Sequence, residues 1–242
     1  MAQLALWLQM LTLAALLAAC AAPARLPPGA APPAYVLLPE AIGRAGEPLA
    51  IAGYLMADQA GVRLVDGLRA APGGPLPIGP PAEQVWLEGA QGGLPDSEGQ
   101  GAAPRYVLAV VRGRLEGPGA YGPGGAYRFR MRGAQVVALT PQETTVAALL
   151  ARPAAYAERP VRVTGELLVR PGAALLTERL GVGGVPAPGT QQLKLAGPLR
   201  AAALPQELRR SPAGDVRFGP VQVEGLWRDG ALVPLMILPV ID

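Results

Sequence analysis

A sequence repeat covers most of the chain and constrains its fold more than any other feature. The segment Glu47–Leu55 (EPLAIAGYL) aligns with Arg159–Leu167 (RPVRVTGEL), at an offset of 112 residues. Two further blocks follow in the same order and at nearly the same offset, Gln84–Gly89 matching Gln192–Gly197 and Ala109–Gly113 matching Val221–Gly225. Three ordered blocks of this kind predict two copies of one domain, over residues 35–141 and 142–242.

Each repeated block alternates apolar and polar residues with a period of two, which is typical of a half-buried strand. A glycine in the middle of such a strand, Gly53 or Gly165, indicates a bend of the kind that a small barrel needs. The second copy predicts strands at 160–169, 173–179 and 191–197, a helix over 200–210, and strands at 219–228 and 231–239. Asp229 and Gly230 predict a type I′ hairpin turn between the last two strands, because both residues tolerate positive φ.

Three strands, a helix and a hairpin in this order resemble the OB-fold, a five-stranded Greek-key barrel. The segment from Thr145 to Tyr156 resembles the short helix that precedes this barrel in bacterial envelope OB-like proteins. The resemblance covers most of 35–242 and implies an all-β protein of two tandem five-stranded OB-fold-like barrels with minor helices. Tandem β-sandwich modules are the alternative. The first copy lacks an obvious helix between its third and fourth strands, since Ala90–Pro104 is Gly-rich and predicts a loop.

The N-terminus has the pattern of a secreted, lipid-modified protein. Residues 4–17 are almost wholly apolar, which is short for a membrane span but suits the core of a signal peptide. The run ends in Leu17-Ala18-Ala19-Cys20, which resembles the bacterial lipoprotein lipobox. The resemblance implies a signal peptide over 1–19 and lipidation of Cys20. One departure is that Met1-Ala2-Gln3 carries no Lys or Arg, and the alternative is that Cys20 is a small residue of a simple signal or anchor helix.

The residues after the cysteine predict a spacer. Residues 20–34 combine the lipidated cysteine with a Pro/Ala-rich stretch that lacks periodicity. Such a stretch is typical of an extended tether. We therefore expect a protein held on the outer face of a bacterial cell membrane, or on the outer membrane, by its lipid.

The composition excludes several kinds of catalytic site. The chain has no His and a single Cys, which removes Ser-His-Asp and Cys-His catalysis, His-coordinated zinc, His-ligated haem and internal disulfides. Ser97 lies in a polar, Gly-flanked stretch without a general base, which is typical of a loop residue. The sequence therefore predicts a non-enzymatic protein with no cofactor and no metal site.

The last hairpin of the first copy differs most from its counterpart and predicts a ligand site. A Gly-rich loop at 117–125 replaces the two-residue turn of the second copy, and loops at this position border the usual ligand face of OB-folds. The predicted anion site consists of outward-facing arginines and one loop tyrosine: Arg112, Arg114, Tyr121, Arg128, Arg130 and Arg132. Each guanidinium offers a planar fork of donors to phosphate or carboxylate. The alternative is a solvated strand face on which Glu88 and Glu116 balance the arginines.

The charge balance argues against general nucleic-acid binding. Residues 35–141 carry nine basic and nine acidic residues, and residues 142–242 carry eleven and nine, without the concentrated positive charge that such binding needs. Trp86 and Trp227 are stacking platforms if exposed and packing residues if buried. We expect a binding or scaffolding protein whose partner is an envelope protein or an anionic glycan or lipid. The runner-up is an extracytoplasmic OB protein that binds nucleic acid, and a hydrolase is a third class without candidate residues.

Overall fold

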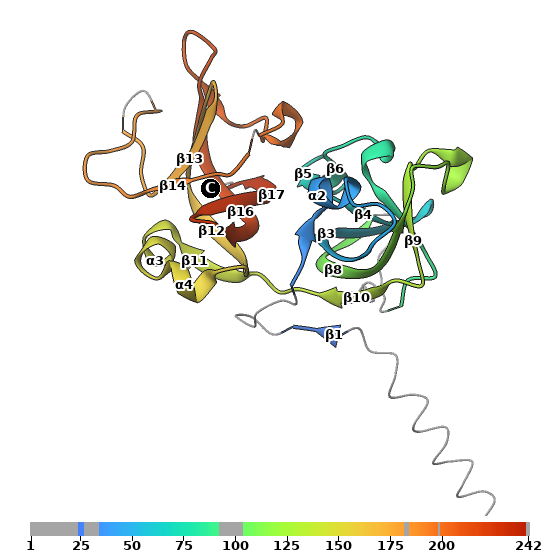
Figure 1. The fold of residues 1–242 in the computed structure, drawn as a ribbon. Helices are drawn as coiled ribbons and strands as arrows, with labels where there is room; N and C mark the ends of the chain where they lie inside the picture. The colour runs from blue at the N-terminus through green and yellow to red at the C-terminus, as the bar shows by residue number, and fades with distance from the viewer. Residues whose placement is uncertain (1–23, 27–33, 92–103, 182–183, 198, 241–242) are drawn as a thin grey trace, which may run out of the picture.

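The computed structural model describes residues 24–26, 34–91, 104–181, 184–197 and 199–240. This part of the chain is mostly strands with few helices, which confirms the all-β fold class. It forms one closed five-stranded barrel and a second, strongly curved sheet beside it (Figure 1).

The first copy forms the closed barrel. Its strands are β3 (Pro48–Asp58), β4 (Gly61–Val65), β7 (Val85–Glu88), β8 (Arg105–Glu116) and β9 (Phe129–Arg132). Around the barrel the order is β3-β4-β7-β9-β8, and β8 pairs back onto β3. The third strand, β7, pairs in parallel with the fifth, β9, while all other pairs around the barrel are antiparallel. Short 3-10 turns at Pro81–Glu83 and Pro123–Gly125 lie in its connections.

The second copy follows the same path but closes less completely. Its strands are β12 (Pro160–Arg170), β13 (Ala173–Thr177), β14 (Gln192–Lys194), β16 (Arg217–Arg228) and β17 (Ala231–Pro239). The order is β14-β13-β12-β16-β17. A single parallel bridge, Leu195 to Leu232, joins the two ends of this sheet, where the first copy has a four-residue ladder. The predicted turn is present, since Asp229 and Gly230 both have positive φ.

The prediction of a helix over 200–210 is wrong. Only Ala201–Ala203 forms a 3-10 turn, and Arg209–Arg210 is a short strand, β15, paired with β16. The cause is Pro205, because a proline disfavours helical φ/ψ in the preceding residue and lacks an N–H donor. Leu204 accordingly is extended, at φ −84 and ψ 132.

The repeated glycine has the same surroundings in both copies. A Cβ added to Gly53 would lie 2.6 Å from the carbonyl oxygen of Val65, and one added to Gly165 would lie 2.8 Å from that of Thr177. Leu64 and Leu176 supply the next contacts, at the same sequence offset. In each copy the first strand thus passes against the backbone of the second at a distance that only glycine allows.

Each copy also begins with a short parallel strand and a helix. In the first copy β2 (Val36–Leu37) pairs with β3 and leads into α2 (Leu38–Ile42). In the second copy β11 (Gln142–Thr145) pairs with β12 and leads into α3 (Val146–Ala151) and α4 (Pro153–Tyr156). The hydroxyl of Thr145 caps α3 by accepting a hydrogen bond from the Ala148 N–H at 3.1 Å. The helix expected within 145–156 is therefore present, in two pieces separated at Arg152.

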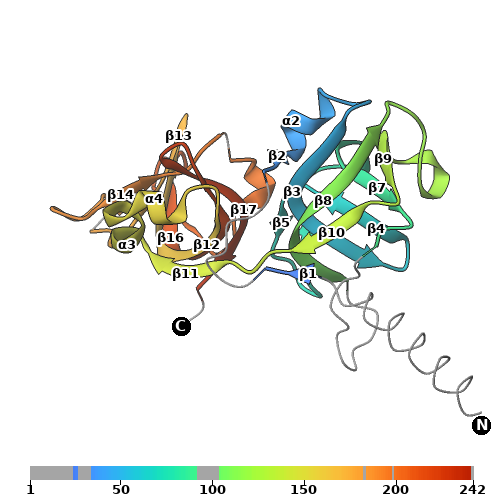
Figure 2. The same cartoon turned by 60° about the horizontal axis from the view of Figure 1, so that its bottom comes forward.

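A segment near the N-terminus lies along the first barrel. β1 (Ala24–Arg25) pairs in parallel with β10 (Gln135–Ala138), which itself continues the sheet beyond β8 (Figure 2). The N–H of Leu26 adds a hydrogen bond of 3.0 Å to the carbonyl of Ala138. These three residues of the expected tether are therefore paired to the barrel.

The two copies share a sheet and a core. β5 (Leu68–Arg69) extends from the first copy and pairs in parallel with β17, and β6 (Leu76–Pro77) pairs with β5. Each barrel has its own apolar core, and a third buried cluster draws on both copies: Ala52, Tyr54, Met56, Val65, Leu68, Leu108, Val110, Leu139, Leu226, Leu235 and Met236. Gly67 lets the segments approach, since a Cβ there would lie 2.6 Å from the carbonyl oxygen of Leu235. The copies are thus packed as one unit.

Candidate functional site

Two arginines of the predicted hairpin site lie beside carboxylates. Arg130 Nε donates to Glu116 Oε2 at 2.8 Å, and its Nη1 lies 3.3 Å from Glu88 Oε1. Arg132 Nε lies 3.3 Å from Glu88 Oε2. The guanidinium of Arg130 also covers the ring of Tyr121, 4.4 Å from its centroid. The hydrogen bond from Arg130 lowers the pKa of Glu116. Glu88 and Glu116 together balance both arginines, as in the alternative interpretation.

The other three arginines of the predicted site do not join this cluster. Arg114 donates to the carbonyl of Gly46 at 2.8 Å, and Arg128 lies over the ring of Phe129. Arg112 is exposed on β8 and makes no ion pair with any residue that the structure describes. The structure thus brings Tyr121, Arg130 and Arg132 together, and anion binding by the six residues stays a prediction.

The long hairpin loop covers the outward face of β4 and β7 in the first copy. Trp86 is half-buried there and packs against Tyr127, with ring centroids 5.0 Å apart. A Cβ on Gly122 would lie 2.6 Å from the Tyr127 ring and 3.0 Å from Trp86, and one on Gly61 would lie 2.2 Å from Trp86. Trp86 is therefore a packing residue, as Trp227 is in the second copy, where it is 3% exposed. The outward face of β4 and β7, beside the loop for which the sequence predicts a ligand site, is thus filled by the first copy's own side chains.

The corresponding face of the second copy is open. A cavity of about 570 Å³ lies over β13 and β14, next to the loop that joins β12 to β13. Its lining combines two cations with small and apolar residues: Val169, Arg170, Gly172, Ala173, Ala174, Leu175, Lys194, Leu195, Gly197 and Leu199. Arg170 and Lys194 are exposed, and neither has an ion-pair partner among the residues that the structure describes. The turn at Asp229–Gly230 is too short to cover this face.

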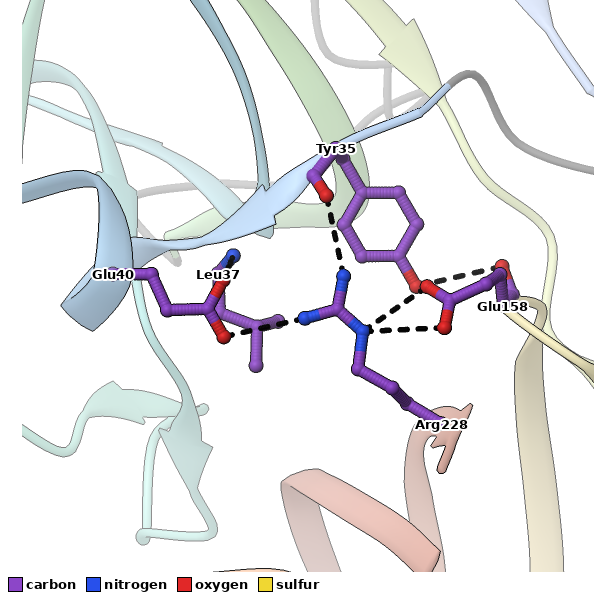
Figure 3. A network of polar contacts seen from close by, with 5 residues as sticks. All are labelled: Tyr35, Leu37, Glu40, Glu158 and Arg228. Atoms are coloured by element: carbon purple, nitrogen blue, oxygen red, sulfur yellow. Dashed lines mark hydrogen bonds and ion pairs between the residues drawn. The ribbon is translucent and has the colours of Figure 1, made fainter. Parts of the chain in front are cut away.

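A polar network at one end of the junction holds the two copies together (Figure 3). Arg228 of β16 donates through Nε to the Glu158 carboxylate at 3.1 Å and through Nη2 to the carbonyl of Tyr35 at 3.2 Å. Its Nη1 reaches Glu40 Oε1 of α2 at 3.2 Å. Burial and the Glu158 carboxylate raise the pKa of Tyr35 above its usual value. One guanidinium therefore joins elements of both copies.

A second network lies deeper in the junction. The hydroxyl of Tyr54, on β3, donates a short hydrogen bond to Glu224 Oε1 on β16. Arg162 Nε and Nη2 donate to the other oxygen of Glu224 at 2.9 and 2.7 Å. Tyr54 and Glu224 are 1% and 4% exposed, and burial, followed by the nearby carboxylate, raises the pKa of Tyr54 well above 10. The Glu224 carboxylate thus accepts hydrogen bonds from one donor of the first copy and two of the second.

A larger cavity, of about 770 Å³, opens between the copies on another side of the junction. Its walls come from the turn after β5, the segment before β15, and the β15–β16 hairpin. The lining residues are Arg69, Ala70, Ala71, Pro72, Ala201, Ala202, Leu204, Pro205, Gln206, Glu207, Arg210, Arg217 and Pro239. The sequence did not predict this cavity, because a helix was expected where the β15–β16 hairpin lies and because Arg69 comes from the other copy.

Several expectations concern residues outside the described ranges, among them Cys20, Ser97 and most of the predicted loop over 90–104. Within the described ranges, no helix is long and apolar enough to cross a membrane. The same residues contain no group of three His, Cys, Asp or Glu side chains placed to hold a metal ion. No protein-family model, curated protein or solved structure matches this chain.

Proposed function

We propose that this protein is a non-enzymatic binding module held by lipidated Cys20 on the outer side of a bacterial membrane, and that it binds an anionic glycan or lipid of the envelope. The observation that carries the proposal is the contrast between the two ligand faces. The first copy covers its own face with Trp86 and Tyr127, whereas the second copy presents an open cavity with Arg170 and Lys194.

The chemistry of the open face favours an anionic partner with apolar or neutral parts. Arg170 and Lys194 supply positive charge, and Leu175 and the alanines beside it supply an apolar wall. None of the residues that line this cavity is aromatic, whereas single-stranded nucleic acids are bound by stacking their bases on aromatic rings. A glycan or lipid therefore fits this face better than a nucleic acid.

The anchor position favours a module seated close to the bilayer. Cys20 precedes β1 by four residues, which span at most about 14 Å when fully extended. Since β1 is paired to β10, a lipid on Cys20 holds the first barrel near the membrane. Two or more acyl chains are needed for stable attachment, and lipoprotein modification supplies them.

The anchor is tested by replacing Cys20 with alanine in the full-length chain. The unmodified chain should incorporate labelled palmitate and sediment with membranes, and C20A should lose both properties because no thiol is left to accept the lipid. A C20A chain that still sediments with membranes would contradict lipid anchoring.

The binding function is tested by co-sedimenting the purified full chain with peptidoglycan sacculi and, in a separate arm, by titrating it with dihexanoylphosphatidylglycerol. One of these probes should bind, and the double variant R170Q/K194Q should bind it at least about fivefold more weakly, because each lost cation removes a charge-assisted contact. R179Q, an exposed change outside the cavity, is the matched control. The proposal would be contradicted if R179Q weakened binding as much as R170Q/K194Q does, or if the chain bound an oligonucleotide more tightly than either probe at low salt.

A further inference from the structure

Three arginines converge on the cavity between the copies. Arg69 comes from β5 of the first copy, and Arg210 and Arg217 come from β15 and β16 of the second. None of the three forms an ion pair or side-chain hydrogen bond with any residue that the structure describes. Glu207 is the one carboxylate among the lining residues. The walls therefore carry an excess of positive charge.

This lack of partners contrasts with the other arginines of the junction. Arg162, Arg200 and Arg228 each meet a carboxylate oxygen, at 2.7, 2.6 and 3.1 Å. The fold thus supplies carboxylates to the arginines that join the copies. It does not supply them to the three that line the cavity.

The backbone forces two of these arginines together. Arg210 and Arg217 are direct partners in the antiparallel β15–β16 pair, so their side chains leave the same face of the hairpin. Like charges directly opposite each other in a sheet are destabilising. The turn between them is fixed, because the Ser211 N–H donates to the carbonyl of Val216 at 2.9 Å and the Ser211 hydroxyl donates to Asp215 at 2.9 Å. The repulsion is therefore built into the hairpin, and an anion between the two guanidiniums relieves it.

The remaining lining restricts the chemistry of that anion. Eight of the lining residues are alanines, prolines or Leu204, so an apolar portion of the ligand has a surface to lie against beside the guanidiniums. The cavity, at about 770 Å³, is within the range of small-molecule sites and much larger than a bare inorganic ion. Guanidinium forks match the oxygens of phosphate in geometry and charge.

We propose that the junction cavity binds an organic phosphate, with its phosphate group among Arg69, Arg210 and Arg217 and its apolar portion against the alanine and proline wall. This site adds a second ligand to the proposed binding function. It rests on that proposal in one respect, because it assumes that the protein binds anionic ligands of the envelope. It is distinct from the open face of the second copy, since the two cavities share no lining residue.

The site is tested by titration calorimetry on the purified full chain in a nonionic detergent. The probes are glycerol 3-phosphate, dihexanoylphosphatidic acid and, as a zwitterionic control, dihexanoylphosphatidylcholine. Saturable binding of the first probe identifies a soluble organic phosphate, and binding of the second alone identifies a lipid headgroup. Either result supports the site if R210Q/R217Q weakens binding by about tenfold or more, equivalent to about 1.4 kcal/mol.

Two further variants make the test specific. R209Q changes the neighbouring residue on β15, which is exposed but does not line the cavity, and it should bind as the unmodified chain does. E207Q removes the lining carboxylate and should tighten binding several-fold. R210Q/R217Q should unfold at the same temperature or a higher one, because it removes a like-charge pair, so a loss of binding cannot be a loss of folding.

The proposal is overturned if no phosphate probe binds at low salt, if the phosphatidylcholine control binds equally well, or if R209Q weakens binding as much as R210Q/R217Q. Failure of this site leaves the proposed function intact when R170Q/K194Q still reduces binding to sacculi or dihexanoylphosphatidylglycerol. Failure at both sites rejects both proposals.

Discussion

β3 and β12 occupy the same place in the two copies, and they agree on one face only. Ile51 and Val163, on the inward faces, are both fully buried in the barrel cores. On the outward face, Tyr54 of β3 is buried between the copies. Its counterpart 112 residues later, Glu166, is only partly buried. The repeat therefore preserves what a barrel needs inside and leaves the outside to be set by the neighbour.

The fourth strands, β8 and β16, also differ at an outward position, but here the buried residue belongs to the second copy. Glu224 of β16 is buried at the junction, whereas its counterpart in β8, Arg112, is exposed. Tyr54 and Glu224 meet each other, so the junction is built from outward positions of both copies. The two copies therefore differ more in the residues at these outward positions than in the residues of their cores.

The largest expected effect comes from the position that the copies share. G53A and G165A should each lower the free energy of unfolding by about 3 kcal/mol, because the added methyl group collides with a backbone carbonyl that cannot move aside. Urea denaturation of each variant measures this. G43A is the matched control, since its Cβ would lie 3.7 Å from the nearest atom, at ordinary contact distance. A large loss in one copy and none in the other would break the equivalence of the two first strands.

A smaller effect is expected from the position at which the copies differ. Y54F should lower the free energy of unfolding by about 2 kcal/mol at pH 7, because it removes a hydrogen bond to a buried charge. The raised pKa of Tyr54 in the folded protein means that its contribution is full below pH 10 and is lost as the pH rises above 10, where the unfolded chain ionises. Thermal unfolding followed from pH 7 to 11 measures both effects.

In that pH series, the unfolding temperature of Y54F should decline less steeply above pH 10 than that of the unmodified chain. Tyr35, whose pKa is also raised, should account for part of the decline that remains. Y106F alters a side chain that is 41% exposed and should change stability little. An alkaline decline of unchanged steepness in Y54F would show that the junction hydroxyl does not couple the two copies.

Much of each barrel was predictable from local pattern. The alternation through Val161, Val163 and Leu167 marks β12, and the mid-strand glycine marks its close approach to β13. The helix over 200–210 was predicted wrongly because apolar spacing outweighed Pro205. One sequence pattern could have predicted the junction. β3 is apolar on both faces, at Ala52 and Met56 as well as at Ile51, and this is typical of a strand that is buried on both sides.

The candidate sites, too, were predictable from the sequence only in part. The alternation of the sequence identifies Arg130 and Arg132, but only the fold shows that Glu88 and Glu116 lie within ion-pair distance of them. Sequence spacing says nothing about such contacts, because each carboxylate comes from a different strand. Arg69, by contrast, belongs to a two-residue strand with no period to detect.

The sequence by itself indicated where the strands of each copy lie, because period-two burial and obligatory glycines are local properties of a strand. It also placed the single cysteine where a lipid anchor is expected. Only the tertiary structure decided which outward faces are buried, which strand face the hairpin loop covers and which arginines lack a carboxylate. Those outcomes depend on distances between segments far apart in the chain, and electrostatic and packing energies follow distance in space.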